Sequence, residues 1–265
     1  FGDWVRYPVM VILLFSAVFV ARRHTGVKFR NSYSMSSLKK AEVEYIFGVQ
    51  GGAAMPIFDD LYDTEGLKLI PMRHEQGAAH AADGYARATG KVGVTLATSG
   101  PGATNLVTGI ATAHMDSIPM VAITGQVATY LMGNDAFQEC DILGVTRPIC
   151  KHSYLIKSSD EVADVVAEAF HIAATGKPGP VVIDFAKDAQ VQESAFHYPE
   201  SVNIRSYNPT VVGHPGQIKK AIDLINQAEK PMIYAGGGVT LANAHEELRH
   251  FTDKTGIPIT VTLMG

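Results

Sequence analysis

From residue 42 onward, short apolar runs alternate with alanine- and glycine-rich stretches whose apolar side chains recur at helical spacing. The runs predict strands at residues 43–47, 67–72, 92–97, 120–124 and 181–185. The stretches between them predict helices at residues 55–62, 76–89, 103–115 and 160–174. Because strands that alternate with helices build a parallel sheet covered on both faces, the sequence predicts an α/β fold with a doubly wound parallel sheet.

This periodicity is lost between residues 190 and 215, where proline, asparagine and glycine are frequent. Such a segment is typical of an interdomain linker. We therefore expect a first domain at residues 35–189, a linker at 190–215, and the start of a second α/β domain at 216–265. The second domain is expected to open with helices at 216–227 and 245–255 and strands at 232–235 and 259–262.

The first 34 residues do not fit this pattern. Residues 9–21 form an apolar run with arginines on both flanks. The run is shorter than the roughly 20 residues of a membrane span, although its length matches a signal-peptide core. Since the chain begins at Phe1 and both flanks are basic, we expect residues 1–34 to be a foreign or mistranslated leader, with Met35 as a plausible start. No membrane association is expected.

Composition and motifs exclude several classes of function. The net charge is −4 and no basic stripe is interleaved with aromatic residues, which argues against nucleic-acid binding. The chain has no P-loop, no HExxH zinc motif and no GxSxG elbow. Its two cysteines, Cys140 and Cys150, form no CxxC pair, so neither a disulfide framework nor a zinc site is expected. A reducing, cytoplasmic setting fits best.

Glu75 is a candidate for acid chemistry. It lies where a predicted strand ends and a predicted helix begins, the edge of an α/β sheet at which ligands usually bind. Alanines recur on the face of the helix that follows, so another surface can approach closely and desolvate the carboxyl. The alternative is an ordinary acidic residue stabilised by the helix dipole, and on this segment alone that alternative is favoured.

Glycine-rich loops follow three of the predicted strands, at residues 51–54, 98–105 and 236–238. Glycine lets the backbone approach a flat ligand or an anion, and a helix N-terminus offers free N–H groups. Taken singly, each loop is more often only a tight turn between a strand and a helix. The triplet at 236–238 also lacks the spacing of a dinucleotide motif.

Taken together, these segments resemble the N-terminal half of acetolactate synthase catalytic subunits, members of the thiamine diphosphate enzyme superfamily. The similarity covers about residue 42 to the end of the chain. It rests on runs in family order, among them FG at 47–48, RHEQGA at 73–78, GYAR at 84–87, ATSGPGATNL at 97–106, DSIP at 116–119, AITGQV at 122–127, DAFQE at 135–139, GPV at 179–181 and KD at 187–188.

The resemblance implies roles for individual residues. Glu75 would hydrogen-bond N1′ of the cofactor's aminopyrimidine ring and promote the form that takes the proton from the thiazolium carbon, while the cofactor serves as electron sink. Two residues would line the pyrimidine pocket, namely Pro101 and Asn105. Five positions would face the reacting centre of the partner subunit, namely Gly51, Gly52, Ala53, Phe137 and Gln138.

The resemblance also implies cofactors. Thiamine diphosphate would bind with Mg²⁺, whose ligands belong to a GDG…N motif that this sequence does not contain. Relatives carry FAD, held in part by an arginine where this chain has Lys177. A lysine could contact a phosphate as a point charge but not in a bidentate manner, so FAD is the less secure expectation. No metal ligand is expected among these residues.

The implied activity is that of a transferase in branched-chain amino-acid biosynthesis, which decarboxylates pyruvate and joins the product to a second 2-keto acid. A homodimer and a small regulatory subunit are the expected partners, and the fragment alone is expected to be inactive. Two alternatives stay open. One is another thiamine diphosphate carboligase, decarboxylase or oxidase, such as glyoxylate carboligase. The other is a truncated, non-catalytic interaction partner.

Overall fold

A computed structural model describes residues 33–265. The expected leader at residues 1–34 lies outside this range except for its last two residues. The chain divides into two compact units, Phe1–Pro209 and Thr210–Gly265, and each is described by itself. Within residues 33–265, no helix combines the length and the apolar character that crossing a membrane requires.

A six-stranded parallel sheet forms the centre of the first unit, within the described residues. The strand order is β2-β1-β3-β4-β6-β5. Its strands are β1 (Tyr45–Gly48), β2 (Lys68–Pro71), β3 (Gly93–Ala97), β4 (Met120–Gln126), β5 (His152–Ile156) and β6 (Pro180–Ala186). Strands β3, β4 and β6 are buried along their whole length, as expected of parallel strands covered on both faces. The predicted α/β fold class is confirmed.

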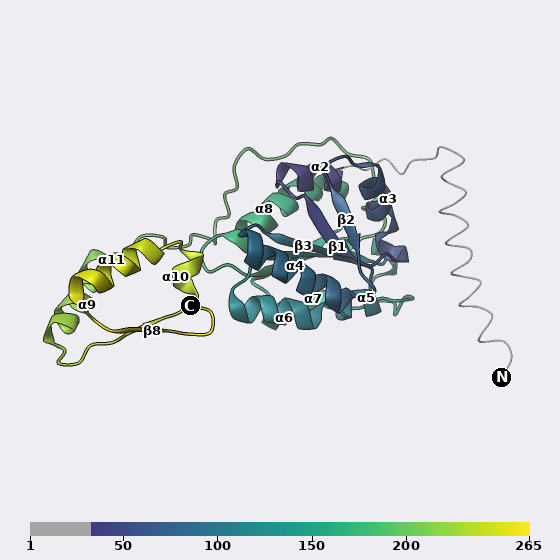
Figure 1. Ribbon diagram of the computed structural model, residues 1–265. Coiled ribbons are helices and arrows are strands. Elements are labelled where there is room, and N and C mark those ends of the chain that lie inside the picture. The colour runs from purple at the N-terminus through teal and green to yellow at the C-terminus, as the bar shows by residue number, and fades with distance from the viewer. Residues whose placement is uncertain (1–32) are drawn as a thin grey trace. The chain divides into compact units, whose positions relative to one another are not determined.

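Helices cover both faces of this sheet (Figure 1). One layer, with its own apolar core, contains α2 (Tyr33–Lys40), α3 (Met55–Asp63) and α8 (Val162–Ala174). The opposite layer packs alanines and leucines against the sheet and contains α4 (Glu75–Thr89) and α6 (Val107–Asp116). Short helices α5 (Pro101–Thr104) and α7 (Ile142–Thr146) complete the elements near the carboxyl ends of the strands.

Helix α2 corrects the sequence interpretation, which placed no helix before the first strand. Met35 and Leu38 are fully buried and belong to the core beneath α8. Tyr33 also packs against this core. The helix was missed because its eight residues include three serines and follow directly on the unmatched leader, so no long apolar periodicity marks it.

The predicted helix at 103–115 is also wrong in its detail, since the chain forms two helices there. Helix α5 ends at Thr104 and α6 begins at Val107, so that Asn105 and Leu106 lie between them. Neither β5 nor α7 was predicted. Both follow the long loop that begins after Gln126, in a stretch where the apolar residues have mixed spacing. Helix α4 is followed by Gly90, which adopts the left-handed conformation common at helix C-termini.

The segment that precedes the second unit runs along the first. Near the start of α8, the Gln192 side chain accepts a hydrogen bond from the Ser159 amide over 3.1 Å. Near the end of α8, the Tyr207 hydroxyl donates to the Thr175 carbonyl over 2.8 Å. Residues 192–207 are therefore fixed at both ends of this helix.

The second unit is a short βαβ arrangement. It contains α9 (Pro215–Gln227), β7 (Ile233–Ala235), α10 (Gly238–Leu241), α11 (His245–Thr255) and β8 (Ile259–Val261), with β7 and β8 parallel. Of the described residues in this unit, only Ala235 is fully buried, and apolar side chains such as Ile222 and Val261 are exposed. The predicted elements are present, with bounds shifted by one residue at most places.

Candidate functional site

The candidate site lies where the strand order reverses between β1 and β3, outside the carboxyl ends of the strands. This is the usual ligand position in open α/β sheets. The loops after the two strands meet there, because the Ala53 amide donates to Thr98 Oγ1 over 3.1 Å. A Cβ at Gly51 would lie 2.5 Å from Thr98. Only glycine at position 51 allows this approach.

Two further glycines keep the second loop close to its neighbours. Gly100 has φ = 55°, a conformation that side chains rarely adopt. A Cβ at Gly102 would lie 2.7 Å from Thr98 Cγ2 and 3.3 Å from Glu75 Oε1. The predicted glycine loops at 51–54 and 98–105 are therefore parts of one structure, and they form a cradle beside the Glu75 carboxylate.

Glu75 is placed at the first residue of α4, directly after β2 and its short connection. His74 caps this helix through Nδ1, which accepts a hydrogen bond from the Gln76 amide over 3.1 Å. Asn105 donates from Nδ2 to Glu75 Oε2 over 3.0 Å. Glu75 is partly buried, so the fully water-poor environment expected for it is not formed by this chain alone.

Asn105 reaches Glu75 because of the break between α5 and α6. The residue follows the last residue of α5 and its side chain is partly buried, whereas Pro101 at the start of α5 is exposed. The helix interruption that the sequence did not predict is thus what presents the amide to the carboxylate.

Phe137 and Gln138 lie on the long loop between the end of β4 at Gln126 and the start of α7 at Ile142. Phe137 is 81% exposed, and Gln138 has φ = 60°. The Gln138 carbonyl oxygen lies 2.6 Å from the position a Cβ would take at Gly100. The structure therefore brings this loop against the glycine cradle. The next residue, Glu139, accepts hydrogen bonds from the Gly133 and Ala136 amides, which lower the pKa of its carboxyl.

Lys177 is not part of this group. It is exposed and precedes β6, at the amino edge of the parallel sheet, whereas Glu75 follows β2 at the carboxyl edge. Any phosphate that Lys177 contacts therefore belongs to a different site.

Two glutamines of the site were missed by the sequence interpretation. Gln190 is 3% exposed and donates from Nε2 to the carbonyls of Ala53 and Phe185, over 2.8 Å in each case. Gln190 thereby ties the glycine turn at residues 51–54 to the end of β6. The only signal in the sequence is a glutamine shortly after the KD pair at 187–188.

The second is Gln126, the last residue of β4, which is 6% exposed. Its Nε2 donates to Asp184 Oδ2 over 2.8 Å, and Thr124 Oγ1 donates to Asp184 Oδ1 over 2.6 Å. Burial raises the pKa of Asp184 to about 7, against the effect of these two hydrogen bonds and with a smaller contribution from Asp141. Asp184 was not predicted as a site residue, because the residues around it form an apolar strand with no sign of a functional role.

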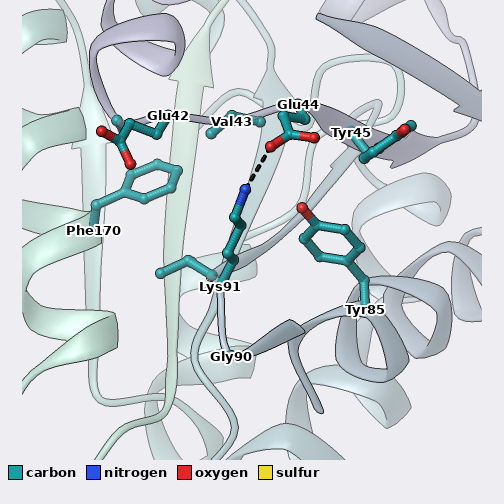
Figure 2. A pocket seen from close by; sticks show the side chains of 10 residues that line it. Glu42, Val43, Glu44, Tyr45, Tyr85, Gly90, Lys91 and Phe170 are labelled. Carbon is teal, nitrogen blue, oxygen red and sulfur yellow. Dashed lines mark hydrogen bonds and ion pairs between the residues drawn. The ribbon is translucent and has the colours of Figure 1, made fainter. Parts of the chain in front are cut away.

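A separate hollow of about 200 Å³ lies at the amino ends of β1 and β3. Figure 2 shows the Lys91 ammonium directed at the Glu44 carboxylate, with Tyr85 beside them. Both partners of this ion pair are about half exposed, so it contributes little to stability. The hollow contains none of the sequence-predicted site residues.

The geometry of the cradle fits a flat, nitrogen-containing ring. Gly51 and Gly102 bring the two loops into close contact around Thr98, and the Glu75 carboxylate lies beside Gly102. Such a carboxyl can accept or donate one hydrogen bond to a ring nitrogen. Among residues 33–265, no cluster of three or more His, Cys, Asp or Glu side chains could hold a metal ion.

Comparison with known proteins places this geometry in a family. Residues 32–145 match the thiamine pyrophosphate enzyme N-terminal TPP binding domain. Residues 218–265 match the thiamine pyrophosphate enzyme central domain. The first match covers strands β1 to β4 and the glycine cradle, and the second covers most of the second unit.

Similar curated proteins carry one name. The chain is 54% identical over 231 residues to the acetolactate synthase large subunit of Buchnera aphidicola from Schizaphis graminum, covering 86% of this chain and 40% of the relative. It is 52% identical to that of Corynebacterium glutamicum, covering 92% and 38%. It is 51% identical to the isozyme 3 large subunit of Escherichia coli, covering 86% and 40%. The chain thus spans about two fifths of these relatives, and it belongs to the thiamine pyrophosphate enzymes.

Proposed function

We propose that this chain supplies the aminopyrimidine-binding domain, and part of the central domain, of an acetolactate synthase catalytic subunit. The proposed reaction is the decarboxylation of pyruvate and the transfer of its two-carbon unit to a second 2-keto acid. The observation that carries the proposal is the Glu75 carboxylate, held by Asn105 beside the glycine cradle. The names and similarity of the relatives support it.

Each residue of the cradle has a proposed task. The loops that Gly51 and Gly102 hold together around Thr98 would lie against the aminopyrimidine ring, and Glu75 Oε1, beside Gly102, would share a proton with the ring nitrogen. Asn105 keeps the carboxylate in one orientation by occupying Oε2. Thiamine diphosphate, when bound, supplies the electron sink for decarboxylation. A correctly oriented carboxyl group contributes by general acid–base catalysis, typically about 10²–10⁴-fold in rate.

Closure of the site is proposed to need a second subunit. Glu75 is partly exposed in this chain, so a further surface is needed to exclude water from it. A homodimer in which a partner covers the cradle would provide this. Since several relatives are named large subunits, a small regulatory subunit is a further proposed partner.

The remaining assignments are also proposals. Mg²⁺ would bind through residues outside the matched two fifths of the relatives, together with the cofactor's diphosphate. FAD would bind at the other edge of the sheet, with Lys177 as a single charged contact to a phosphate. A cytoplasmic location fits two unpaired cysteines.

A chimera tests the proposed function, with this chain replacing the matching part of the Escherichia coli relative. Purified chimera would be assayed with pyruvate, thiamine diphosphate and Mg²⁺, and the products identified. Acetolactate is expected, and Glu75→Gln should lower its formation by at least about 10²-fold. Glu65→Gln, on an exposed connection of the same domain, is the matched control and should keep full activity.

The outcomes separate the alternatives. A different product from pyruvate or glyoxylate would identify another carboligase of the superfamily. A folded chimera that binds the cofactor but forms no product would favour a non-catalytic interaction partner. Full activity of the Glu75→Gln chimera would remove the role assigned to this residue.

A further inference from the structure

Both the nitrogen and the oxygen of the Gln126 side-chain amide form hydrogen bonds. All of these bonds lie near the carboxyl ends of β4 and β6. Nε2 donates to Asp184 Oδ2 and to the Cys140 carbonyl, over 2.8 Å in each case. Oε1 accepts from the Val127 amide over 2.8 Å. The side chain therefore joins the end of β4, the neighbouring β6 and the far end of the long loop.

Asp184 is a firm anchor for this bridge. Thr124 lies opposite Asp184 in the register of β4 and β6, and Gln126 lies two residues further along β4 on the same face. The two β4 side chains donate to different oxygens of one carboxylate that is 2% exposed. The contact with Asp184 in the sheet thus fixes the orientation of the Gln126 amide, and this orientation directs the amide toward the loop.

The loop that ends at Cys140 needs such an anchor. Asp135 and Gln138 both adopt positive φ, 52° and 60°, which is unfavourable for residues other than glycine. Phe137 is 81% exposed and contributes little to a core. Near its beginning, the loop is held by Asp188, which accepts hydrogen bonds from the backbone and hydroxyl of Thr129.

The anchored end also determines how the loop meets the cradle. Only one residue separates Cys140 from Gln138, whose carbonyl packs against Gly100. On its other side, β4 approaches the first glycine turn, because a Cβ at Gly125 would lie 2.6 Å from the Ala53 carbonyl carbon. Gln126 is therefore next to Gly125, which packs against the first glycine turn, and is bonded to the end of the loop that packs against Gly100.

We propose that Gln126, oriented by Asp184, is a positioning residue that sets the place of the loop carrying Phe137 and Gln138. It touches neither substrate nor cofactor, and it acts through its bond to the Cys140 carbonyl. The importance of this loop for the reaction rests on the proposed function. The claim that Gln126 fixes the position of the loop is independent of that function.

The reactivity of Cys140 reports directly on the position of the loop. Its thiol is partly buried, so a reagent reaches it faster when the loop moves away. Gln126→Met keeps the length of the side chain and all charges but removes the bridge. Modification of Cys140 by a neutral disulfide reagent, followed by mass spectrometry of the full chain, should accelerate about tenfold, the effect of losing a hydrogen bond of ordinary strength. The rate at Cys150 should stay within about twofold, because that thiol lies outside the loop.

Thr124→Val is the matched control. It removes the other hydrogen bond to the same buried carboxylate and leaves the contact between Gln126 and Cys140 in place. If the release of Cys140 followed from general loss of stability, Thr124→Val would accelerate its modification as much as Gln126→Met does. That result would overturn the proposal, as would an unchanged rate at Cys140 in Gln126→Met.

Two further measurements keep the test decisive. If Gln126→Met does not fold, Gln126→Asn retains the amide but is too short for both acceptors, and it should show the same selective release of Cys140. In the chimera described above, Gln126→Met should lower kcat with little change in the affinity for thiamine diphosphate. A selective change at Cys140 without any acetolactate activity in the parent chimera would sustain the positioning role and contradict only the proposed function.

Discussion

The side-chain amide of Asn105 donates a hydrogen bond to Oε2 of Glu75 over 3.0 Å. The other carboxylate oxygen, Oε1, faces Gly102, where a Cβ would approach it to 3.3 Å. One oxygen is therefore committed to the protein and the other is directed at the cradle. This division gives the carboxyl group a fixed orientation and turns Oε1 toward the glycine loop.

Asn105→Ala should lower acetolactate formation by the chimera about 10–100-fold, because a hydrogen bond to a charged group contributes about 1.5–3 kcal/mol. Steady-state kinetics with saturating cofactor would measure the loss. Thr104→Ala, a change at the neighbouring exposed residue, serves as the control. An equal loss in both variants would show that the α5 turn, rather than the amide, is what matters.

Gly102→Ala should weaken binding of thiamine diphosphate, since the new methyl group would lie 2.7 Å from Thr98 Cγ2 and would enter the cradle. Overpacking of this kind costs about 1–3 kcal/mol, which calorimetric titration of the chimera would detect. Adding Thr98→Ser removes the methyl that clashes and keeps the hydroxyl that binds the Ala53 amide. The double variant should recover part of the affinity, whereas Gly238→Ala, in the second unit with open space around it, should have no effect.

Asp184→Asn should stabilise the chain at pH 8 and not at pH 4. Burial raises the pKa of Asp184 to about 7 from an ordinary 3.8, so the folded state binds the proton more tightly than the unfolded state does. The free energy of unfolding therefore falls as pH rises between these two values, by up to about 4 kcal/mol for this group. Asparagine can accept from Gln126 and donate to the Thr124 hydroxyl, as the protonated acid does, without this penalty.

Urea unfolding of both chains at pH 4, 5.5, 7 and 8, with Asp188→Asn as a control carboxylate, would check this. In Asp188, burial is outweighed by hydrogen bonds from Thr129, which lower the pKa of its carboxyl. The control should therefore lose stability at neutral pH. A difference between Asp184→Asn and the parent chain that does not grow with pH would contradict the prediction.

Tyr207→Phe should release the segment that lies along α8. The hydroxyl donates to the Thr175 carbonyl and accepts from the Lys151 ammonium over 3.0 Å, so its loss should cost about 1 kcal/mol and leave part of the lysine's hydrogen bonding unmet. Limited proteolysis should then cut residues 192–207 faster than in the parent chain. Tyr234→Phe, at an exposed tyrosine of the second unit, should leave the cleavage rate unchanged.

The alternation of strands and helices was sufficient to predict the fold class, because fully buried strands such as β3 and β6 stand out as mostly apolar runs. Helix α2 escaped because its buried positions are few and its partners, on α8, are more than a hundred residues away in the chain. Local periodicity reports burial, but it does not report what covers a short polar helix.

The candidate site was predictable as a set of residues but not as an arrangement. The resemblance identified Glu75, Asn105 and the glycine loops, and the structure brings them together. The roles of Gln126, Asp184 and Gln190 depend on side chains that meet across strands and loops, over separations such as the 58 residues between Gln126 and Asp184. No spacing rule within the sequence encodes such contacts.

Glu75 and Lys177 lie at opposite ends of the parallel strands, and a strand of five residues alone spans roughly 16 Å. Substitutions on one rim need not disturb the other. If both rims hold cofactors, changing Lys177 should weaken flavin binding and leave thiamine diphosphate binding unchanged. The need for each cofactor could then be studied, and could change during evolution, separately.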